Sequence, residues 1–124
     1  VLILDEPSAG LDPNGRERLT ELLYHLHQNY KMTIILISHR MEEIARLASR
    51  VIVLDEGKIV MDDNPRKIFS QGKKLRELGL DLPEITIIMN KLQKRGLNVR
   101  TDIFNISEAK NEILTELRSK QNVN

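Results

Sequence analysis

The sequence predicts an α/β fold with an incomplete parallel sheet, followed by an antiparallel hairpin and a small helical C-terminal extension. Three observations lead to this prediction. Two short apolar runs, 1–4 and 33–37, flank an amphipathic segment of helical length. A second pair of apolar runs, 51–54 and 59–61, flanks a short polar turn. From Gly72 onward the strand-like runs stop and only helical spacing remains.

The first 37 residues are expected to form a strand–helix–strand unit. Residues 1–4 are continuously apolar, which is typical of a parallel strand covered on both faces. A helix is expected over 13–30, because Asp12 is a good N-cap and Pro13 a good first helical residue. The apolar residues that share one face of this helix are Leu19, Leu22, Leu23 and Leu26. The strand 33–37 then follows through a right-handed crossover.

The middle of the chain is expected to contain a hairpin between two short helices. A helix over 41–48 leads into the strand 51–54. The residues 55–58 contain Asp, Glu and Gly, which favour the turn of an antiparallel hairpin, so the strand 59–61 should return along the first. A helix over 65–69 ends this half of the chain.

The remaining residues predict a helical extension. We expect one domain over 1–71 and an extension over 72–124. Within the extension, apolar residues at helical spacing predict helices over 83–95 and 107–119. Each of these helices has an apolar stripe that needs a partner surface.

The composition restricts the functions that the chain can have. Its 124 residues are 40% hydrophobic and 30% charged, which is typical of a globular protein. The net charge of +1 and the low aromatic content argue against a nucleic-acid partner. The absence of cysteine excludes disulfides and thiolate metal sites. No apolar run reaches the roughly 18–20 residues of a membrane span, so any membrane role should depend on partners.

The sequence contains two similar Asp-Glu pairs, in VLILDE and VIVLDE. Asp5 and Glu6 follow the first parallel strand, and His39 follows the next, at the sheet edge where α/β proteins bind ligands. Asp55 and Glu56 fall in the hairpin turn, where such residues are expected for backbone reasons alone. We therefore expect a functional role for the first pair and a structural role for the second.

A carboxylate pair at a strand end suits phosphoryl transfer to water. One carboxylate can hold Mg²⁺ through a water molecule, while its neighbour orients and deprotonates the attacking water. Adjacent side chains on a strand point in opposite directions, so Asp5 and Glu6 should have two separate tasks. The imidazole of His39 adds a donor that can reach the terminal phosphate.

Three motifs in this order resemble the ATP-binding subunits of ABC transporters. VLILDEP is similar to the Walker B strand with its glutamate, SAGLDP to the D-loop, and TIILISH to the strand that ends in the switch histidine. The resemblance implies a P-loop NTPase-type sheet, with ATP and Mg²⁺ as cofactors. It also implies that Asp5 helps to hold Mg²⁺ through water, that Glu6 is the catalytic carboxylate, and that His39 acts at the γ-phosphate.

The same resemblance implies an interface role for the loop after the first strand. Ser8 to Asp12 would lie between two ATPase subunits and help to bind the nucleotide there, with Asp12 communicating with the opposite nucleotide site. Asp12 is also expected to cap the following helix, and the two roles are compatible.

The segment KLRELGLDLPEITIIMNKLQKRGLNV, residues 74–99, resembles the C-terminal extension of energy-coupling-factor transporter ATPases. That resemblance implies a role in powering the uptake of vitamins, cobalt or nickel ions. The implied partners are a second ATPase subunit, in a homo- or heterodimer, and transmembrane transporter subunits. The implied location is the cytoplasmic face of the cell membrane, and the extension would help two ATPase subunits to associate.

Several motifs of the family do not occur in these residues. There is no G-x-x-x-x-G-K-[ST] phosphate loop and no LSGGQ-type signature, and Val1 already lies in a strand-like run. We therefore expect a piece of a longer protein that, in isolation, neither binds ATP tightly nor hydrolyses it. Uncovered sheet faces should favour its self-association. Two alternatives stay open: an ABC-type ATPase acting on DNA or ribosomes, and a non-catalytic dimerisation fragment.

Overall fold

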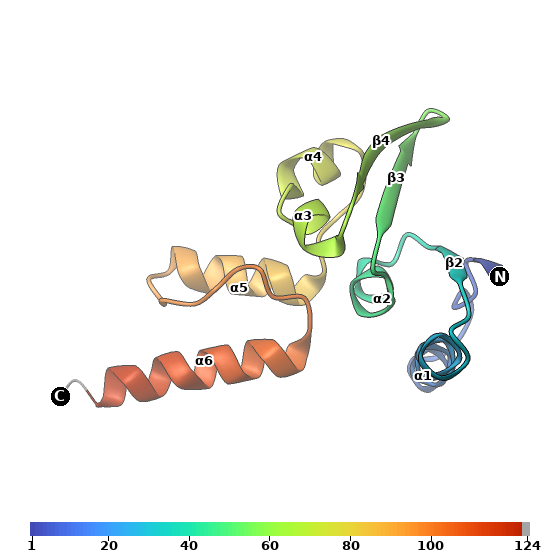
Figure 1. Ribbon diagram of the computed structural model, residues 1–124. Helices are drawn as coiled ribbons and strands as arrows, with labels where there is room; N and C mark the ends of the chain where they lie inside the picture. The colour runs from blue at the N-terminus through green and yellow to red at the C-terminus, as the bar shows by residue number, and fades with distance from the viewer. Residues whose placement is uncertain (123–124) are drawn as a thin grey trace.

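The computed structural model of the protein describes residues 1–122, which form two separate two-stranded sheets and six helices (Figure 1). Strand β1 (Leu2–Asp5) pairs in parallel with β2 (Ile34–Ile37), and helix α1 (Pro13–Tyr30) connects them. The register pairs Leu2 with Ile34 and Asp5 with Ile37. The expected strand–helix–strand unit is therefore confirmed, with the strand bounds shifted by one residue.

Helix α1 begins where its capping residues place it. The carboxylate of Asp12 accepts a hydrogen bond from the backbone N–H of Gly15 at 2.7 Å, and Pro13 occupies the first turn. Leu23 and Thr20 are its buried residues. The helix stops at Lys31, whose left-handed backbone (φ 51°) ends the run of helical hydrogen bonds.

The parallel sheet is covered on one face only within residues 1–122. Its side chains alternate between half-buried and exposed positions. The exposed apolar side chains of the open face are Ile3, Ile35 and Ile37. The expectation that continuous apolarity means two covered faces is therefore wrong for the described residues, because no described element packs over this face. The exposed isoleucines instead match the expectation of an uncovered apolar surface.

Helix α2 (Met41–Leu47) leads into an antiparallel hairpin of β3 (Val51–Asp55) and β4 (Lys58–Asp63). The two turn residues, Glu56 (φ 48°) and Gly57 (φ 75°), both have left-handed backbones. Two such residues are typical of a tight hairpin turn that follows the strand twist. The hairpin is confirmed, although it forms its own sheet and does not extend the parallel one.

Helices α3 (Pro65–Phe69) and α4 (Gly72–Glu77) pack with the hairpin in one core. The buried residues of this core are Ile44, Val53, Met61, Ile68, Phe69 and Leu75. Leu75 lies beyond the expected boundary at residue 72, so the packing here is continuous across it. The division of the chain into 1–71 and 72–124 stays a prediction.

Helices α5 (Glu84–Lys94) and α6 (Ile106–Gln121) form a second, smaller core. Its buried residues are Met89, Val99, Ile103 and Ala109. The hydroxyl of Thr86 donates a hydrogen bond to the carbonyl of Ile103 at 2.6 Å, so the buried polar atom has a partner. Both predicted helices are confirmed within one to two residues.

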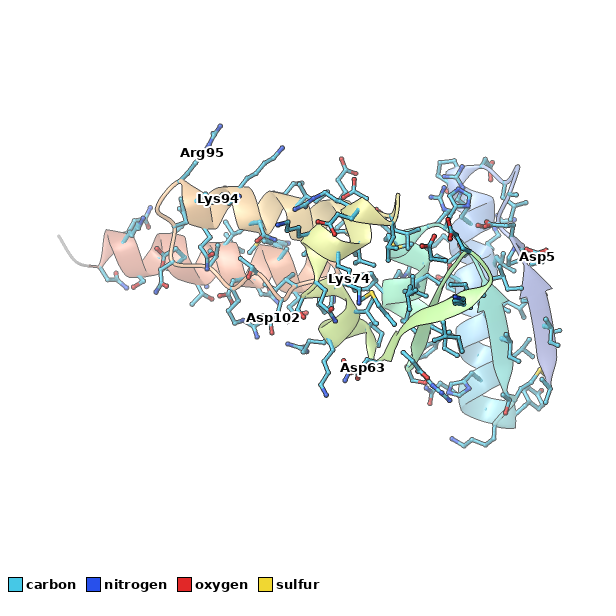
Figure 2. The ribbon with its side chains drawn as sticks, turned by 90° about the horizontal axis from the view of Figure 1, so that it is seen from above. Asp5, Asp63, Lys74, Lys94, Arg95 and Asp102 are labelled. Atoms are coloured by element: carbon cyan, nitrogen blue, oxygen red, sulfur yellow. The ribbon has the colours of Figure 1, made fainter. Side chains whose placement is uncertain are left out.

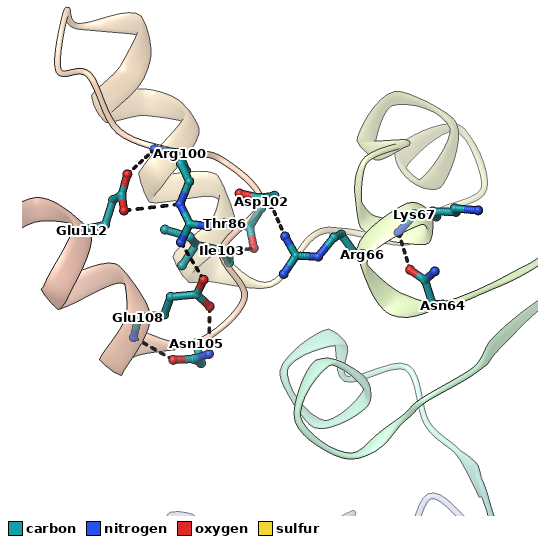
Figure 3. Close-up of polar contacts among 10 residues, drawn as sticks. All are labelled: Asn64, Arg66, Lys67, Thr86, Arg100, Asp102, Ile103, Asn105, Glu108 and Glu112. Atoms are coloured by element: carbon teal, nitrogen blue, oxygen red, sulfur yellow. Dashed lines mark hydrogen bonds and ion pairs between the residues drawn. The ribbon is translucent and has the colours of Figure 1, made fainter.

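Polar contacts fix the loop between α5 and α6 (Figure 3). Arg66 of α3 forms an ion pair with Asp102, which joins this loop to the first core. Arg100 contacts two carboxylates of α6, those of Glu108 (2.8 Å) and Glu112 (3.3 Å). The Arg66 ion pair thus connects the extension to the hairpin half, and the Arg100 contacts hold the loop against α6.

The molecule is elongated, with the parallel strands at one end and the C-terminal end of α6 at the other (Figure 1). Figure 2 shows Asp5 at one end and Lys94 and Arg95 toward the opposite end. Among residues 1–122, no helix combines the length and apolarity that crossing a membrane requires.

Candidate active site

The two parallel strands end side by side and bring their polar residues to one edge. Asp5 pairs with Ile37, and the backbone N–H of Glu6 donates to the carbonyl of Ile37 at 2.8 Å. Ser38 and His39 follow directly after Ile37. Residues that are 33 positions apart in the sequence therefore meet where each strand ends.

Glu6 and His39 contact each other at this edge. The Nδ1 atom of His39 lies 2.8 Å from Oε1 of Glu6, and an ionised carboxylate can only accept, so the imidazole N–H donates. The side chain of Glu6 is 33% exposed and that of His39 is 77% exposed, so solvent reaches both. The second oxygen of Glu6 and the Nε2 atom of His39 have no protein partner in the described residues.

Glu6 directly follows strand β1 and has a left-handed backbone. Glu6 has φ 47°, a left-handed conformation that costs an L-residue roughly 1–2 kcal/mol. Glu56, the second glutamate of the repeated motif, has nearly the same φ of 48°. The two sites share local geometry and differ in their neighbours, because Glu56 lies in the hairpin turn and pairs with no histidine.

Asp5 is exposed, and its carboxylate makes no hydrogen bond or ion pair within residues 1–122. A free carboxylate at a strand end fits Mg²⁺, which one or two protein carboxylates hold together with waters and phosphate oxygens. No group of three or more His, Asp or Glu side chains in the described part of the chain is placed to enclose a metal ion. Asp5 would therefore supply only part of the coordination shell of such a cation, and waters and phosphate oxygens would supply the rest.

The loop after β1 has one buried and several exposed residues. The hydroxyl oxygen of Ser8 is buried and has no hydrogen-bond partner in the described residues. Ala9 and Gly10 are exposed, as is Asp12, whose carboxylate caps α1 through Gly15. The loop thus presents its backbone and Asp12 to solvent, while the side chain of Ser8 faces inward.

The structure brings three of the sequence-predicted residues, Asp5, Glu6 and His39, to one edge. Ser8 and Asp12 lie on the adjoining loop, and within the described residues neither side chain forms a hydrogen bond with His39. Sequence reasoning missed Glu43, a buried carboxylate just after this edge. Its only sequence signal is an acidic residue in the first turn of a helix, which is common on exposed helices too.

Comparison with known proteins identifies relatives that match almost all of the chain. No family model matches it. It is 45% identical to the energy-coupling factor transporter ATP-binding protein EcfA2 of Caldanaerobacter subterraneus subsp. tengcongensis, over 99% of this chain and 43% of that protein. It is 47% identical to EcfA2 of Acetivibrio thermocellus, over 95% of this chain and 42% of that protein.

A solved structure supports the same relationship. CbiO1 from Clostridium perfringens, described as part of the ABC transporter complex CbiONQ, matches with a TM-score of 0.53 and 35% identity. The match covers 72% of this chain and 36% of that one. The chain spans less than half the length of the curated relatives it matches. It is therefore a homologue of part of an ABC transporter ATP-binding subunit, of the energy-coupling-factor kind.

Proposed function

We propose that these residues are part of an ATP-hydrolysing subunit that powers solute uptake through a membrane transporter. The contact between Glu6 and His39 at the end of two parallel strands carries this proposal. It supplies a carboxylate and an imidazole at the edge where α/β proteins bind their ligands. The free carboxylate of Asp5 adds a cation ligand beside them.

Each of the three residues has a distinct task in ATP hydrolysis. Glu6 keeps one oxygen on His39 and uses the other to orient and deprotonate the attacking water. His39 donates to the γ-phosphate region from its second ring nitrogen in the form that carries a proton on both nitrogens, because its Nδ1–H already donates to Glu6. Asp5 would hold Mg²⁺ through a water molecule, and the bound ion would supply positive charge toward the phosphoryl transition state.

The loop from Ser8 to Asp12 lies at the interface with a second ATPase subunit. Its exposed backbone and the carboxylate of Asp12 support this role. The buried, unpartnered hydroxyl of Ser8 fits a loop whose polar contacts are completed on nucleotide binding or association, since an unsatisfied buried hydroxyl costs free energy. Asp12 communicates with the opposite nucleotide site from this position.

The names of the relatives support an assembly with transporter subunits. They place EcfA2 in an energy-coupling factor transporter and CbiO1 in the ABC transporter complex CbiONQ. From the family resemblance we propose a vitamin, or a cobalt or nickel ion, as the transported solute, with transmembrane subunits and a second ATPase as partners. The protein acts at the cytoplasmic face of the membrane, without nucleic acid.

The test is ATP turnover of the full-length protein that carries these residues. Glu6→Gln removes the general base and keeps the shape of the side chain, so the ATPase kcat should fall by about 10²-fold or more. Binding of Mg-ATP, measured by calorimetric titration, should stay intact because Glu6 contributes to turnover and not to affinity.

The repeated motif offers a matched control. Glu56→Gln makes the same chemical change in the same backbone conformation, but in the hairpin turn. This variant should retain wild-type turnover. Equal turnover of the Glu6→Gln variant and the wild type would remove Glu6 from the mechanism.

A further inference from the structure

Glu43 is the one charged side chain among the buried residues that the structure describes, with an exposed fraction of 7%. It lies in the first turn of α2, just after the candidate site. Burying an ionised carboxylate costs several kcal/mol unless hydrogen bonds or nearby positive charge compensate for it, as general estimates indicate. Its burial therefore calls for a specific partner.

The partner is the residue that precedes His39. The hydroxyl of Ser38 donates to Oε2 of Glu43 at 2.7 Å, and the same Ser38 oxygen accepts from the backbone N–H of Arg40 at 3.1 Å. His39 lies between Ser38 and Arg40 in the sequence, so the hydroxyl of Ser38 connects the residues on both sides of it. The buried carboxylate of Glu43 thus fixes the orientation of that hydroxyl.

The backbone of Glu43 holds the same turn. The N–H of Glu43 donates to the carbonyl of Arg40 at 3.1 Å. A small cavity of about 230 Å³ adjoins the carboxylate, and Arg16 and Arg40 are among its lining residues.

The imidazole of His39 has little packing of its own, because 77% of it is exposed. Its contact with Glu6 at 2.8 Å thus depends on the backbone of the turn that carries it. We propose that Glu43 is a positioning residue, which through Ser38 holds the 38–40 turn so that His39 faces Glu6 and the nucleotide. This inference rests on the function proposed above, in which His39 acts at the γ-phosphate.

The test is a double-mutant cycle in the full-length protein. Glu43→Gln keeps the shape of the side chain and replaces a charge-assisted hydrogen bond with a neutral one, which is about half as strong. We expect the ATPase kcat to fall by about 10-fold to 10²-fold, because a misplacement of about 1 Å can cost on the order of 10²-fold. The KM for Mg-ATP should change little, and Ser38→Ala should have the same effect as Glu43→Gln.

The cycle separates positioning from a general loss of stability. In a His39→Ala background, Glu43→Gln should have almost no further effect, because its target is gone. Glu42→Gln is the matched control: Glu42 is the exposed neighbour on the same helix turn, and its variant should keep wild-type kcat. Wild-type kcat in Glu43→Gln, or the same fold-loss with and without His39, would overturn the proposal.

A crystal structure of the Glu43→Gln variant gives a readout that is independent of activity. We expect the His39 Nδ1 to Glu6 Oε1 contact, 2.8 Å in the wild type, to be lost or replaced by several imidazole positions. An unchanged contact would refute the positioning role even if His39→Ala has no measurable turnover. If Glu6→Gln and His39→Ala both leave turnover unchanged, the proposed function fails, while this distance still tests the inference about Glu43.

Discussion

Asp12 is a residue whose structural and functional roles can be separated by mutation. Its carboxylate caps α1 by accepting from the N–H of Gly15 at 2.7 Å, as the Asp-Pro sequence predicts. Its proposed interface role needs a charged side chain on an exposed loop. Asparagine caps helices about as well as aspartate does but carries no charge.

We expect Asp12→Ala to lower the free energy of unfolding by about 1 kcal/mol, because the helix loses its cap. Asp12→Asn should leave it nearly unchanged. Chemical denaturation of the full-length protein measures both values. If the alanine variant is as stable as the wild type, the cap contributes nothing, and if the asparagine variant keeps full turnover, the charge of Asp12 is not needed at the interface.

Single residues also show what the sequence could not predict. Asp5, Glu6 and His39 were identified from motifs and from the rule that parallel strands bring their ends to one edge, and the structure does bring them together. Glu43 was missed because its burial depends on a contact with Ser38 across a turn. Local sequence gives no sign of which acidic residue in a helix's first turn will face inward.

At the level of elements, helix starts with strong capping signals were predicted well. Helices α1 and α3 begin at Pro13 and Pro65, each after a capping Asp or Asn. Helix α6 begins one residue earlier than predicted, because Asn105 is the cap and accepts from the N–H of Glu108 at 2.8 Å. The strand ends differ from the predicted ones by one or two residues, because backbone pairing, and not local apolarity, sets them.

Helix α5 offers a direct test of the second core. Met89 is fully buried, whereas its neighbour Ile88 is 43% exposed. Met89→Ala should destabilise the protein by about 2–5 kcal/mol, because it leaves a cavity in a small core. Ile88→Ala should cost much less. Thermal and chemical denaturation measure both, and equal effects of the two substitutions would show that Met89 does not lie in the core.

At the scale of the whole molecule, the described residues form two small hydrophobic cores and two separate two-stranded sheets. The sequence predicted the four strands but not that the hairpin would stay apart from the parallel sheet, because such pairing is non-local. The isoleucines of the open face are exposed, so the 124 residues in isolation should self-associate. That the isolated chain lacks tight ATP binding and turnover also stays a prediction.

The elongated shape separates the extension from the candidate site. Asp5 lies at one end of the molecule, and the tip of α5, with Lys94 and Arg95, lies toward the other (Figure 2). The tip of the extension therefore contributes no side chain to the strand edge. The role in association that the family resemblance implies for the extension is therefore expected to act through the assembly and not through contact with the nucleotide.

The most direct measurement is a crystal structure of the full-length protein with Mg²⁺ and a non-hydrolysable ATP analogue. The account predicts a water-linked Mg²⁺ at Asp5, the terminal phosphate within hydrogen-bonding distance of His39, and Glu6 beside the position of the attacking water. A nucleotide bound away from this strand edge, with Asp5 and His39 in contact with neither phosphate nor metal, would contradict it.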